Sequence, residues 1–297
     1  MKENVKLSHR LEYAGVLTVA HTIGYLPIDL GTGLGASIAR GAARLKALRK
    51  RADRNLAFAM PDLDADNRRK ISIEMLDGLT RTLLEYRFLK TLFTEEDRIE
   101  IAGVEHLKAA QAAGKGAVLA TGHFGNWEII RLAFAQQGWP PALIYRQFNN
   151  PLFDAYSRNL MSIVDAPLFH KGRRGALGMM RHVRGGGAAL ILTDQRFSRA
   201  PEIPFFGKPA KTSLGSAEIA LNYGAALLPV RGERLGRSSR FRVVIEAPCA
   251  VENRTPEEVM TEINSRVEAW ARAKPEQYFW MHNRWGKVQA PRKREGA

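Results

Sequence analysis

The feature that most constrains the fold is a short apolar run that ends in glycine and is followed at once by a helical pattern. The run is "GKGAVLATG" at residues 114–122, and the helical pattern continues through Gln137. The same order of an apolar run and a helical pattern then repeats, with "PALIYR" at residues 141–146 before another helix from Pro151. Runs of this kind predict buried strands that alternate with helices. This order predicts a parallel sheet with helices on both faces.

Later segments extend the same sheet. "GGGAALILTDQ" is a buried run that ends in polar residues, and "LLPVRGER" and "FRVVIEA" supply two further strands around a helix predicted over Ser213–Tyr223. We therefore predict an α/β fold for residues 96–286, with a mixed, mostly parallel central sheet flanked by helices. Ligands collect at the carboxyl ends of strands in such sheets. The stretches "ATGHFGNWEII" and "TDQRF" both lie at such ends.

Residues 1–95 differ from this core, because their apolar residues recur at helical spacing and β-branched alternation is scarce. The run at residues 13–28 carries no formal charge and follows a basic start. A bilayer span needs about 20 apolar residues, so this shorter run predicts a helix that lies in or against a membrane interface. We reject a cleaved signal peptide, because no small-residue cleavage site leads into a polar start.

Arginines gather directly after this apolar run, in "ARGAARLKALRKRADR". A basic residue near an anionic leaflet contributes roughly 1 kcal/mol to membrane binding. We therefore predict an N-terminal membrane-associating region, with contacts to anionic lipid from Arg40, Arg44, Arg49 and Arg51. A solvated face on a soluble helix explains the same pattern. At the other end of the chain, residues 287–297 are predicted to form a basic, disordered tail.

The whole chain is strongly basic. Its 45 Lys and Arg against 30 Asp and Glu give a formal net charge of +15, so its surface attracts polyanions such as nucleic acid, an anionic membrane or an acidic protein. The sequence carries no helix-turn-helix, zinc-knuckle or RNP pattern, which argues against nucleic acid as a partner. Its single cysteine, Cys249, excludes an intrachain disulfide and fits a reducing compartment.

A histidine and a glutamate in "ATGHFGNWEII" suggest acid–base chemistry. If a helix starts near Phe124, His123 lies in the turn at the strand end and Glu128 lies in the first two helical turns. A carboxylate beside an imidazole holds one tautomer and stabilises imidazolium, as a general base requires. No serine or cysteine lies in a nucleophile-elbow pattern, so direct acyl transfer to a hydroxyl is favoured over a covalent acyl-enzyme. A purely structural His–Glu pair explains the motif equally well.

Four segments together resemble one family. "TGHFGNWE" is similar to the histidine motif of the bacterial lipid A biosynthesis acyltransferases, the lauroyl and myristoyl transferases of the late steps of the Kdo2-lipid A pathway. "YRQFNNPLFD", the segment from "DQRF" to "ALLPV", and "PEQYFWMHNRW" resemble further signatures of that family. The resemblance implies transfer of a fatty acyl chain from acyl carrier protein to a hydroxyl on a hydroxyacyl chain of a lipid A precursor. It also implies a location at the cytoplasmic face of the inner membrane.

The resemblance extends to individual residues. It implies that His123 is the base and Glu128 its partner. We expect the substrate to be bound by Arg146, Asp194, Gln195, Lys208 and Arg284. A guanidinium suits a phosphate or carboxylate, and a glutamine amide could donate to an acyl carbonyl. Surface ion pairs or core packing explain the basic members of this set as well. No cofactor and no metal are expected.

Two other interpretations stay open at this point. A related enzyme could acylate a different glycolipid, such as a mannoside of phosphatidylinositol. Alternatively, the chain could be a non-catalytic, basic membrane-binding protein, which would tolerate the loss of His123. Assays on substrates and on a His123 variant separate these interpretations from the lipid A hypothesis.

Overall fold

A seven-stranded sheet forms the centre of the computed structural model, which describes residues 5–286. The strand order is β1-β9-β8-β2-β5-β3-β4. The strands are β1 (Ile99–Ala102), β2 (Ala117–Thr121), β3 (Ala142–Tyr145), β4 (Leu168–His170), β5 (Ala188–Leu192), β8 (Ala226–Arg234) and β9 (Phe241–Ile245). Strands β8 and β9 pair antiparallel, and all other neighbours in this order pair parallel. The predicted mixed, mostly parallel sheet is therefore confirmed.

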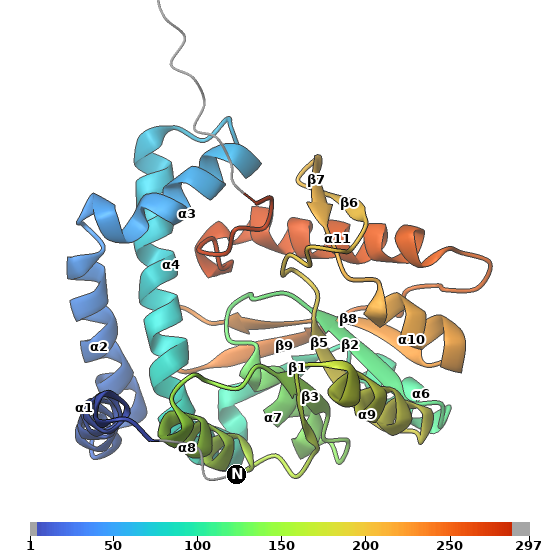
Figure 1. The fold of residues 1–297 in the computed structure, drawn as a ribbon, viewed down its shortest axis with the longest axis horizontal. Coiled ribbons are helices and arrows are strands. Elements are labelled where there is room, and N and C mark those ends of the chain that lie inside the picture. The colour runs from blue at the N-terminus through green and yellow to red at the C-terminus, as the bar shows by residue number, and fades with distance from the viewer. Residues whose placement is uncertain (1–4, 287–297) are drawn as a thin grey trace, which may run out of the picture.

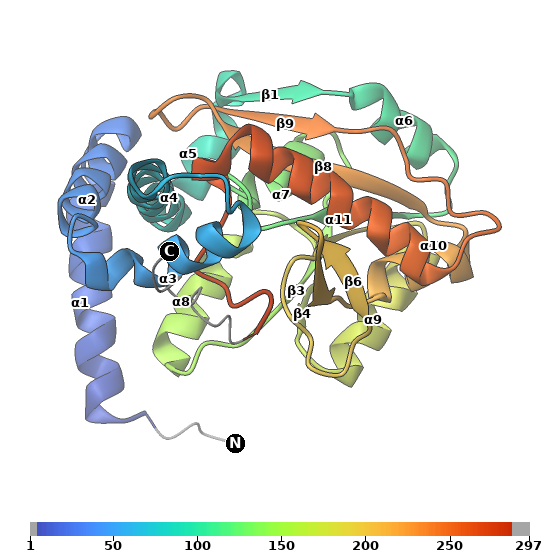
Figure 2. The same cartoon turned by 90° about the horizontal axis from the view of Figure 1, so that it is seen from above.

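Helices cover both faces of this sheet (Figures 1 and 2). They are α6 (Val104–Ala112), α7 (Glu128–Gln136), α8 (Pro151–Met161), α9 (Arg173–Arg184), α10 (Gly215–Tyr223) and α11 (Pro256–Ala273). Successive side chains of a strand point to opposite faces. In β2, Leu119 accordingly joins the cluster that contains Phe134 of α7, whereas Val118 joins the cluster that contains Met179 of α9 and Val259 of α11.

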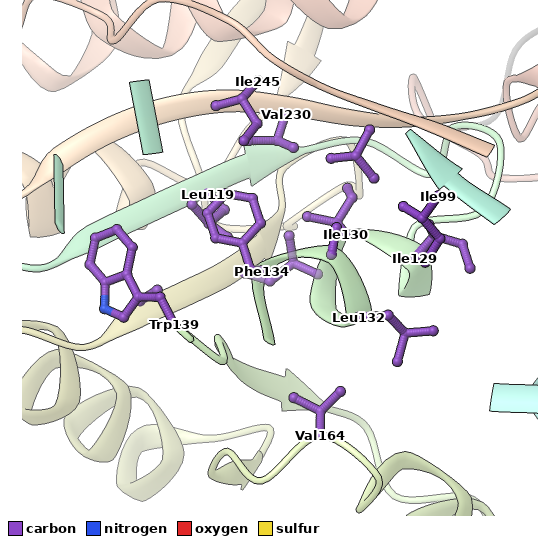
Figure 3. Close-up of a cluster of buried hydrophobic side chains, with 14 of the residues drawn as sticks. Ile99, Leu119, Ile129, Ile130, Leu132, Phe134, Trp139, Val164, Val230 and Ile245 are labelled. Atoms are coloured by element: carbon purple, nitrogen blue, oxygen red, sulfur yellow. The ribbon is translucent and has the colours of Figure 1, made fainter. Parts of the chain in front are cut away.

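The core on the α7 side is shown in Figure 3. Leu119, Ile130, Phe134 and Val230 are each fully buried there, between α7 and the sheet. Full burial of a side chain of this size stabilises the fold by about 1.5–3 kcal/mol relative to exposure. This packing holds the N-terminal end of α7 against the carboxyl ends of the central strands, where the site described below is located.

The N-terminal part of the chain is helical. It contains α1 (Leu7–Gly24), α2 (Ile28–Ala42), α3 (Lys46–Ala59), α4 (Ala65–Glu85) and α5 (Leu89–Thr94), and short 3-10 turns at Tyr86–Phe88 and Glu96–Arg98. Helix α4 begins where the Asp64 side chain accepts a hydrogen bond from the Asn67 N–H over 2.7 Å. None of the described helices is both long enough and apolar enough to cross a bilayer. The tail predicted at residues 287–297 lies outside the described residues.

A two-stranded hairpin lies outside the main sheet. Strands β6 (Glu202–Phe205) and β7 (Lys208–Lys211) pair antiparallel, and Phe206 and Gly207 form their turn with φ angles of 55° and 65°. Both phenylalanines of this segment are buried, with 1% exposure for Phe205 and 4% for Phe206. The hairpin packs on α11, and a short 3-10 turn at Pro275–Gln277 leads from that helix into the last described segment.

Candidate active site

His123 lies in the loop between β2 and α7, whose backbone is bonded to two other parts of the chain. The Asn126 N–H donates to the Gly232 carbonyl over 3.0 Å, and the Gly125 N–H donates to the Gln277 carbonyl over 2.8 Å. Gly125 has a φ of 53°, and a Cβ atom there would lie 2.0 Å from the Gly232 carbonyl oxygen. Only glycine fits this position, because it lacks the Cβ atom.

These bonds delay the start of the helix. A start near Phe124 was predicted, but α7 begins at Glu128. The N–H groups of the preceding loop are bonded to β8 and to the segment after α11, so they are not arranged as a helical first turn. The prediction of the boundary was therefore wrong, and Glu128 is the first residue of the helix.

The imidazole of His123 is held by Asp194, which follows β5. His123 Nδ1 lies 2.7 Å from Asp194 Oδ1, and the His123 backbone N–H donates to Oδ2 over 2.8 Å. Strands β2 and β5 are parallel neighbours, with Thr121 opposite Leu192. His123 and Asp194 each lie two residues beyond those positions, so both emerge at the same edge of the sheet.

The surroundings of Asp194 keep its carboxyl group ionised. Burial alone would raise the pKa of Asp194, but the charge and hydrogen bonds of His123, together with the Arg284 guanidinium, hold that pKa below its ordinary value. An ionised carboxylate can only accept, so the proton of this hydrogen bond is on Nδ1. In the neutral form of the ring, the lone pair then lies on Nε2.

His123 Nε2 is the atom available for proton transfer. The Gln195 side-chain amide nitrogen lies 3.3 Å from it and donates to its lone pair. The ring also contacts Trp127 and Phe279, with centroid separations of 5.0 Å and 5.8 Å. The side chain of His123 is 15% exposed. The ring is thus held on several sides without being sealed from its surroundings.

A cavity of about 300 Å³ opens beside the ring. It lies between α4 and the turn that joins β8 to β9. Its lining includes His123 and Trp127, and charged residues contribute to its wall, among them Glu74, Asp77, Arg234, Arg237 and Lys274. A hydroxyl group and a polar headgroup can therefore both reach the neighbourhood of the imidazole.

Glu128 is not the partner of the imidazole, and that prediction was wrong. Its side chain is 1% exposed and forms an ion pair with Arg131, while the Tyr86 hydroxyl lies 3.5 Å from its Oε2. As the first residue of α7, Glu128 is directed to this buried side of the helix, and Asp194 holds the ring in its place. Burial raises the pKa of the Glu128 carboxyl above its ordinary value, against the opposing effect of Arg131.

Two of the other predicted site residues lie at the edge of the sheet. Gln195 contacts the imidazole, as described above. Arg146 is exposed in the loop directly after β3. Because β3 is the neighbour of β5, Arg146 lies at the same edge as the His123–Asp194 pair but one strand further along.

Lys208 and Arg284 lie elsewhere. The Lys208 ammonium lies over the Phe58 ring, 5.5 Å from its centroid. Arg284 is 2% exposed and donates to the Lys211 carbonyl over 2.7 Å and to the Thr212 hydroxyl over 2.5 Å. The prediction that Arg284 binds substrate was therefore wrong, because its guanidinium is withdrawn into the protein. Its charge acts on the site indirectly, by lowering the pKa of Asp194.

The four arginines predicted to contact anionic lipid fall into two groups. Arg40 forms an ion pair with Asp77, and Arg49 forms one with Asp53. Arg44 and Arg51 are exposed. The predicted contact with anionic lipid is therefore kept for Arg44 and Arg51 alone, since the charges of Arg40 and Arg49 are compensated within the protein.

The chain matches one family model, described as bacterial lipid A biosynthesis acyltransferase, over residues 1–287. It belongs to that family. The protein is therefore an acyltransferase, and the arrangement around His123 is the candidate centre for its chemistry.

Individual relatives of this acyltransferase are distant. It is 27% identical to the lipid A biosynthesis lauroyltransferase of Escherichia coli, over 91% of this chain and 89% of that one. It is 30% identical to a phosphatidylinositol mannoside acyltransferase of Mycobacterium tuberculosis, over 54% of this chain and 52% of that one. A solved structure with a weak likeness is the 1-acyl-sn-glycerophosphate acyltransferase of Thermotoga maritima, with a TM-score of 0.41 and 13% identity, covering 84% of this chain and 99% of that chain.

Proposed function

We propose that this acyltransferase moves a fatty acyl chain from acyl carrier protein to a hydroxyl on a hydroxyacyl chain of a lipid A precursor, with His123 as the general base. The observation that carries the proposal is the 2.7 Å contact between His123 Nδ1 and Asp194 Oδ1. Membership of the family and the likeness to a lauroyltransferase support the choice of acceptor.

The proton transfer runs through Nε2. The acceptor hydroxyl replaces the Gln195 amide at this atom and gives its proton to the ring while its oxygen attacks the thioester carbon. Asp194 stabilises the imidazolium that forms. The tetrahedral intermediate then collapses, the carbon–sulfur bond breaks, and the imidazolium returns the proton to the thiolate. General-base catalysis of this kind contributes about 10²- to 10⁴-fold to a rate.

Negative charge that develops on the thioester oxygen needs a donor. The backbone N–H groups of Gly125 and Asn126 are already bonded to the Gln277 and Gly232 carbonyls, which removes them from this role. Gln195 is better placed, because its amide is released from Nε2 when the acceptor hydroxyl arrives. We therefore assign Gln195 the role of oxyanion donor.

The charge of the protein suits the proposed donor. Acyl carrier proteins are acidic, and a chain with a formal net charge of +15 attracts them over a distance. No tight pocket for a protein partner is required for such steering.

We also propose that the enzyme rests on the cytoplasmic face of the inner membrane through α1 and α2. On α2, Leu30, Leu34 and Ile38 are four residues apart and are 51%, 52% and 75% exposed. On α1, Leu7 and Leu11 are 72% and 67% exposed. Apolar side chains in such a stripe suit the acyl boundary of a bilayer, and the exposed Arg44 after α2 suits its anionic headgroups.

A mannoside of phosphatidylinositol is a second candidate acceptor. It is favoured by the 30% identity to a phosphatidylinositol mannoside acyltransferase over 164 residues. The proposed chemistry at His123 is the same for both acceptors. Parallel assays with a lipid A precursor and with a phosphatidylinositol mannoside, each with acyl carrier protein as donor, decide between them.

The test of the proposed mechanism uses His123→Ala and Asp194→Asn. We expect each variant to lose transfer from acyl carrier protein by about 10²- to 10⁴-fold. Circular dichroism and thermal unfolding check that both remain folded. His106→Ala is the matched control, because His106 lies on α6 with a side chain that is 31% exposed. Full transfer by a folded His123→Ala variant would show that His123 is not the general base.

A further inference from the structure

A second cavity lies between α3 and the segment that follows α11, two parts of the chain that are seen side by side in Figures 1 and 2. Its volume is about 480 Å³. The lining residues, which define what we call the α3 cavity, are Ala47, Leu48, Lys50, Arg51, Arg54, Met281 and Asn283. Three of these residues are cations and none is an acid.

We propose that the α3 cavity binds a phosphate group on the headgroup of the acceptor lipid. The proposal rests on the proposed function in one respect, since it takes the acceptor to be a phosphorylated glycolipid. It adds a binding site for the headgroup, separate from the cavity beside His123.

The cations of the α3 cavity lack compensating carboxylates. Within residues 5–286, no ion pair involves Lys50, Arg51 or Arg54, whereas their neighbour Arg49 is paired with Asp53. Arg54 Nη2 donates to the neutral side chain of Asn283 over 2.9 Å, and its Nε is buried without a partner. Guanidinium groups bind phosphate in a bidentate manner, and an ammonium group adds a point charge.

The α3 cavity is joined to the candidate active site by a chain of hydrogen bonds. Asn55 of α3 donates from its amide to the Trp280 and His282 carbonyls, over 2.7 Å each. His282 lies between two residues of the cavity wall, and its Nε2 accepts the Arg196 N–H over 2.9 Å. The residue before Arg196 is Gln195, whose amide contacts the base. The wall of the α3 cavity is therefore connected through His282 and Arg196 to the residue that contacts the base.

The apolar part of the wall favours a lipid headgroup over a free anion. Leu48 lines the cavity and is 49% exposed, and Leu45, three residues earlier, is 65% exposed. Leu45 lies between α2 and α3. The wall of the α3 cavity therefore offers both apolar side chains and cations to a lipid headgroup.

A phosphate could also come from the prosthetic arm of acyl carrier protein. That group is a phosphodiester with a single negative charge. A sugar phosphate monoester carries more charge and more free oxygens, which matches two guanidinium groups and one ammonium group better. The experiment has an arm for each source.

The experiment uses the double variant Lys50→Gln/Arg51→Gln, whose two side chains are exposed. Transfer kinetics are measured in neutral detergent with phosphorylated and enzymatically dephosphorylated acceptor. We expect KM for the phosphorylated acceptor to rise about 10- to 100-fold. KM for the dephosphorylated acceptor and KM for acyl carrier protein are expected to stay within about twofold of the unmodified protein. The matched control is Arg69→Gln/Lys70→Gln, which removes the same charge from an exposed part of α4.

Two kinetic outcomes overturn the proposal. An equal rise in KM for both acceptors would make the effect one of general surface charge, and a rise confined to acyl carrier protein would assign the cavity to the donor. A binding measurement separates this proposal from the proposed function. Isothermal titration with a soluble glucosamine phosphate should give heat that the double variant loses, even if no acyl transfer is found. Equal heat from both proteins would refute the site.

Discussion

Glu128 and Arg131 form a buried ion pair on the first turn of α7. Their side chains are 1% and 0% exposed, and Arg131 Nε and Nη2 have no other partner among the described residues. Two opposite charges withdrawn from water stabilise each other, so the loss of either leaves an uncompensated charge in the core. The pair therefore links the first and fourth residues of α7, the helix that follows the His123 loop.

Glu128→Ala should lower the free energy of unfolding by about 3–5 kcal/mol, because it leaves the Arg131 guanidinium buried and unpaired. Urea denaturation measures this loss. Glu105→Ala is the control, since that carboxylate is 71% exposed on α6. The double variant Glu128→Leu/Arg131→Leu should recover much of the stability. A Glu128→Ala protein with unchanged stability and no activity would instead assign Glu128 a chemical role.

Gln195→Ala should lower kcat for transfer about 10²- to 10³-fold, because the variant lacks the proposed oxyanion donor. Its melting temperature should change little, as Gln195 is only partly buried. Steady-state kinetics with both substrates give the result, with Gln111→Ala on the exposed face of α6 as control. An increase in kcat would show that the amide only blocks Nε2 and has no part in the reaction.

His282 should make the protein less stable in mild acid. Burial, the main influence, lowers its pKa below the ordinary value, and its Nε2 must be unprotonated to accept the Arg196 N–H. As the pH falls below about 6.5, the unfolded chain takes up a proton that the folded protein resists, so the folded state loses stability.

The measurement is the melting temperature between about pH 7.5 and pH 5.5. His282→Gln, which keeps a side-chain acceptor, should flatten the decline, whereas His106→Gln on the surface should leave it unchanged. Parallel curves for the His282 variant and the unmodified protein would show that this histidine does not set the acid limit.

The exposed apolar side chains of α2, at Leu30, Leu34 and Ile38, should contribute to membrane binding. Leu34→Gln/Ile38→Gln removes two exposed apolar side chains, each worth about 1.5–3 kcal/mol when buried, so partitioning to vesicles should fall at least about tenfold. Co-sedimentation with phosphatidylglycerol-containing vesicles measures it. Leu177→Gln on α9, which lies far from α2 in Figures 1 and 2, is the control. Unchanged partitioning of the double variant would exclude α2 as the contact.

Arg44 provides an electrostatic test of the same surface. Arg44→Gln should weaken binding to anionic vesicles more than to neutral ones, and added salt should have the same effect, because mobile ions screen exposed charges. Co-sedimentation at low and at high salt gives the comparison. Equal losses on both vesicle types would count against contact with anionic headgroups.

Much of the fold could be predicted from local patterns. The apolar runs that became β2, β3 and β5 were recognisable by their length and by the glycines or prolines before them, and Pro151 marked the first turn of α8. The order of strands could not be predicted in the same way, because it depends on pairing between segments far apart in the chain. Short β4, with three residues, is too brief for a pattern, and α11 was not predicted.

Local patterns also identified some residues of the site, but not the contacts between them. His123 was identified because glycines and a strand end surround it, and Asp194 was recognised as a polar residue after a strand. Their contact follows only once β2 and β5 are known to be neighbours. For Glu128, the sequence did hold a signal for its partner, since Arg131 is three residues later on the same helix. The prediction instead paired Glu128 with His123, five residues earlier, because both residues lie in the same motif.

The contact between Gln195 and Nε2 of His123 bears on whether the acyl donor is lost to hydrolysis. A base with a bare lone pair would activate any water molecule that entered, and the fatty thioester would be hydrolysed without product. Because the Gln195 amide is hydrogen-bonded to that lone pair, water has to displace this amide before it can reach Nε2. The hydroxyl of a bound lipid displaces the amide more readily than water does. Cleavage of the donor thioester therefore follows the binding of the acceptor lipid.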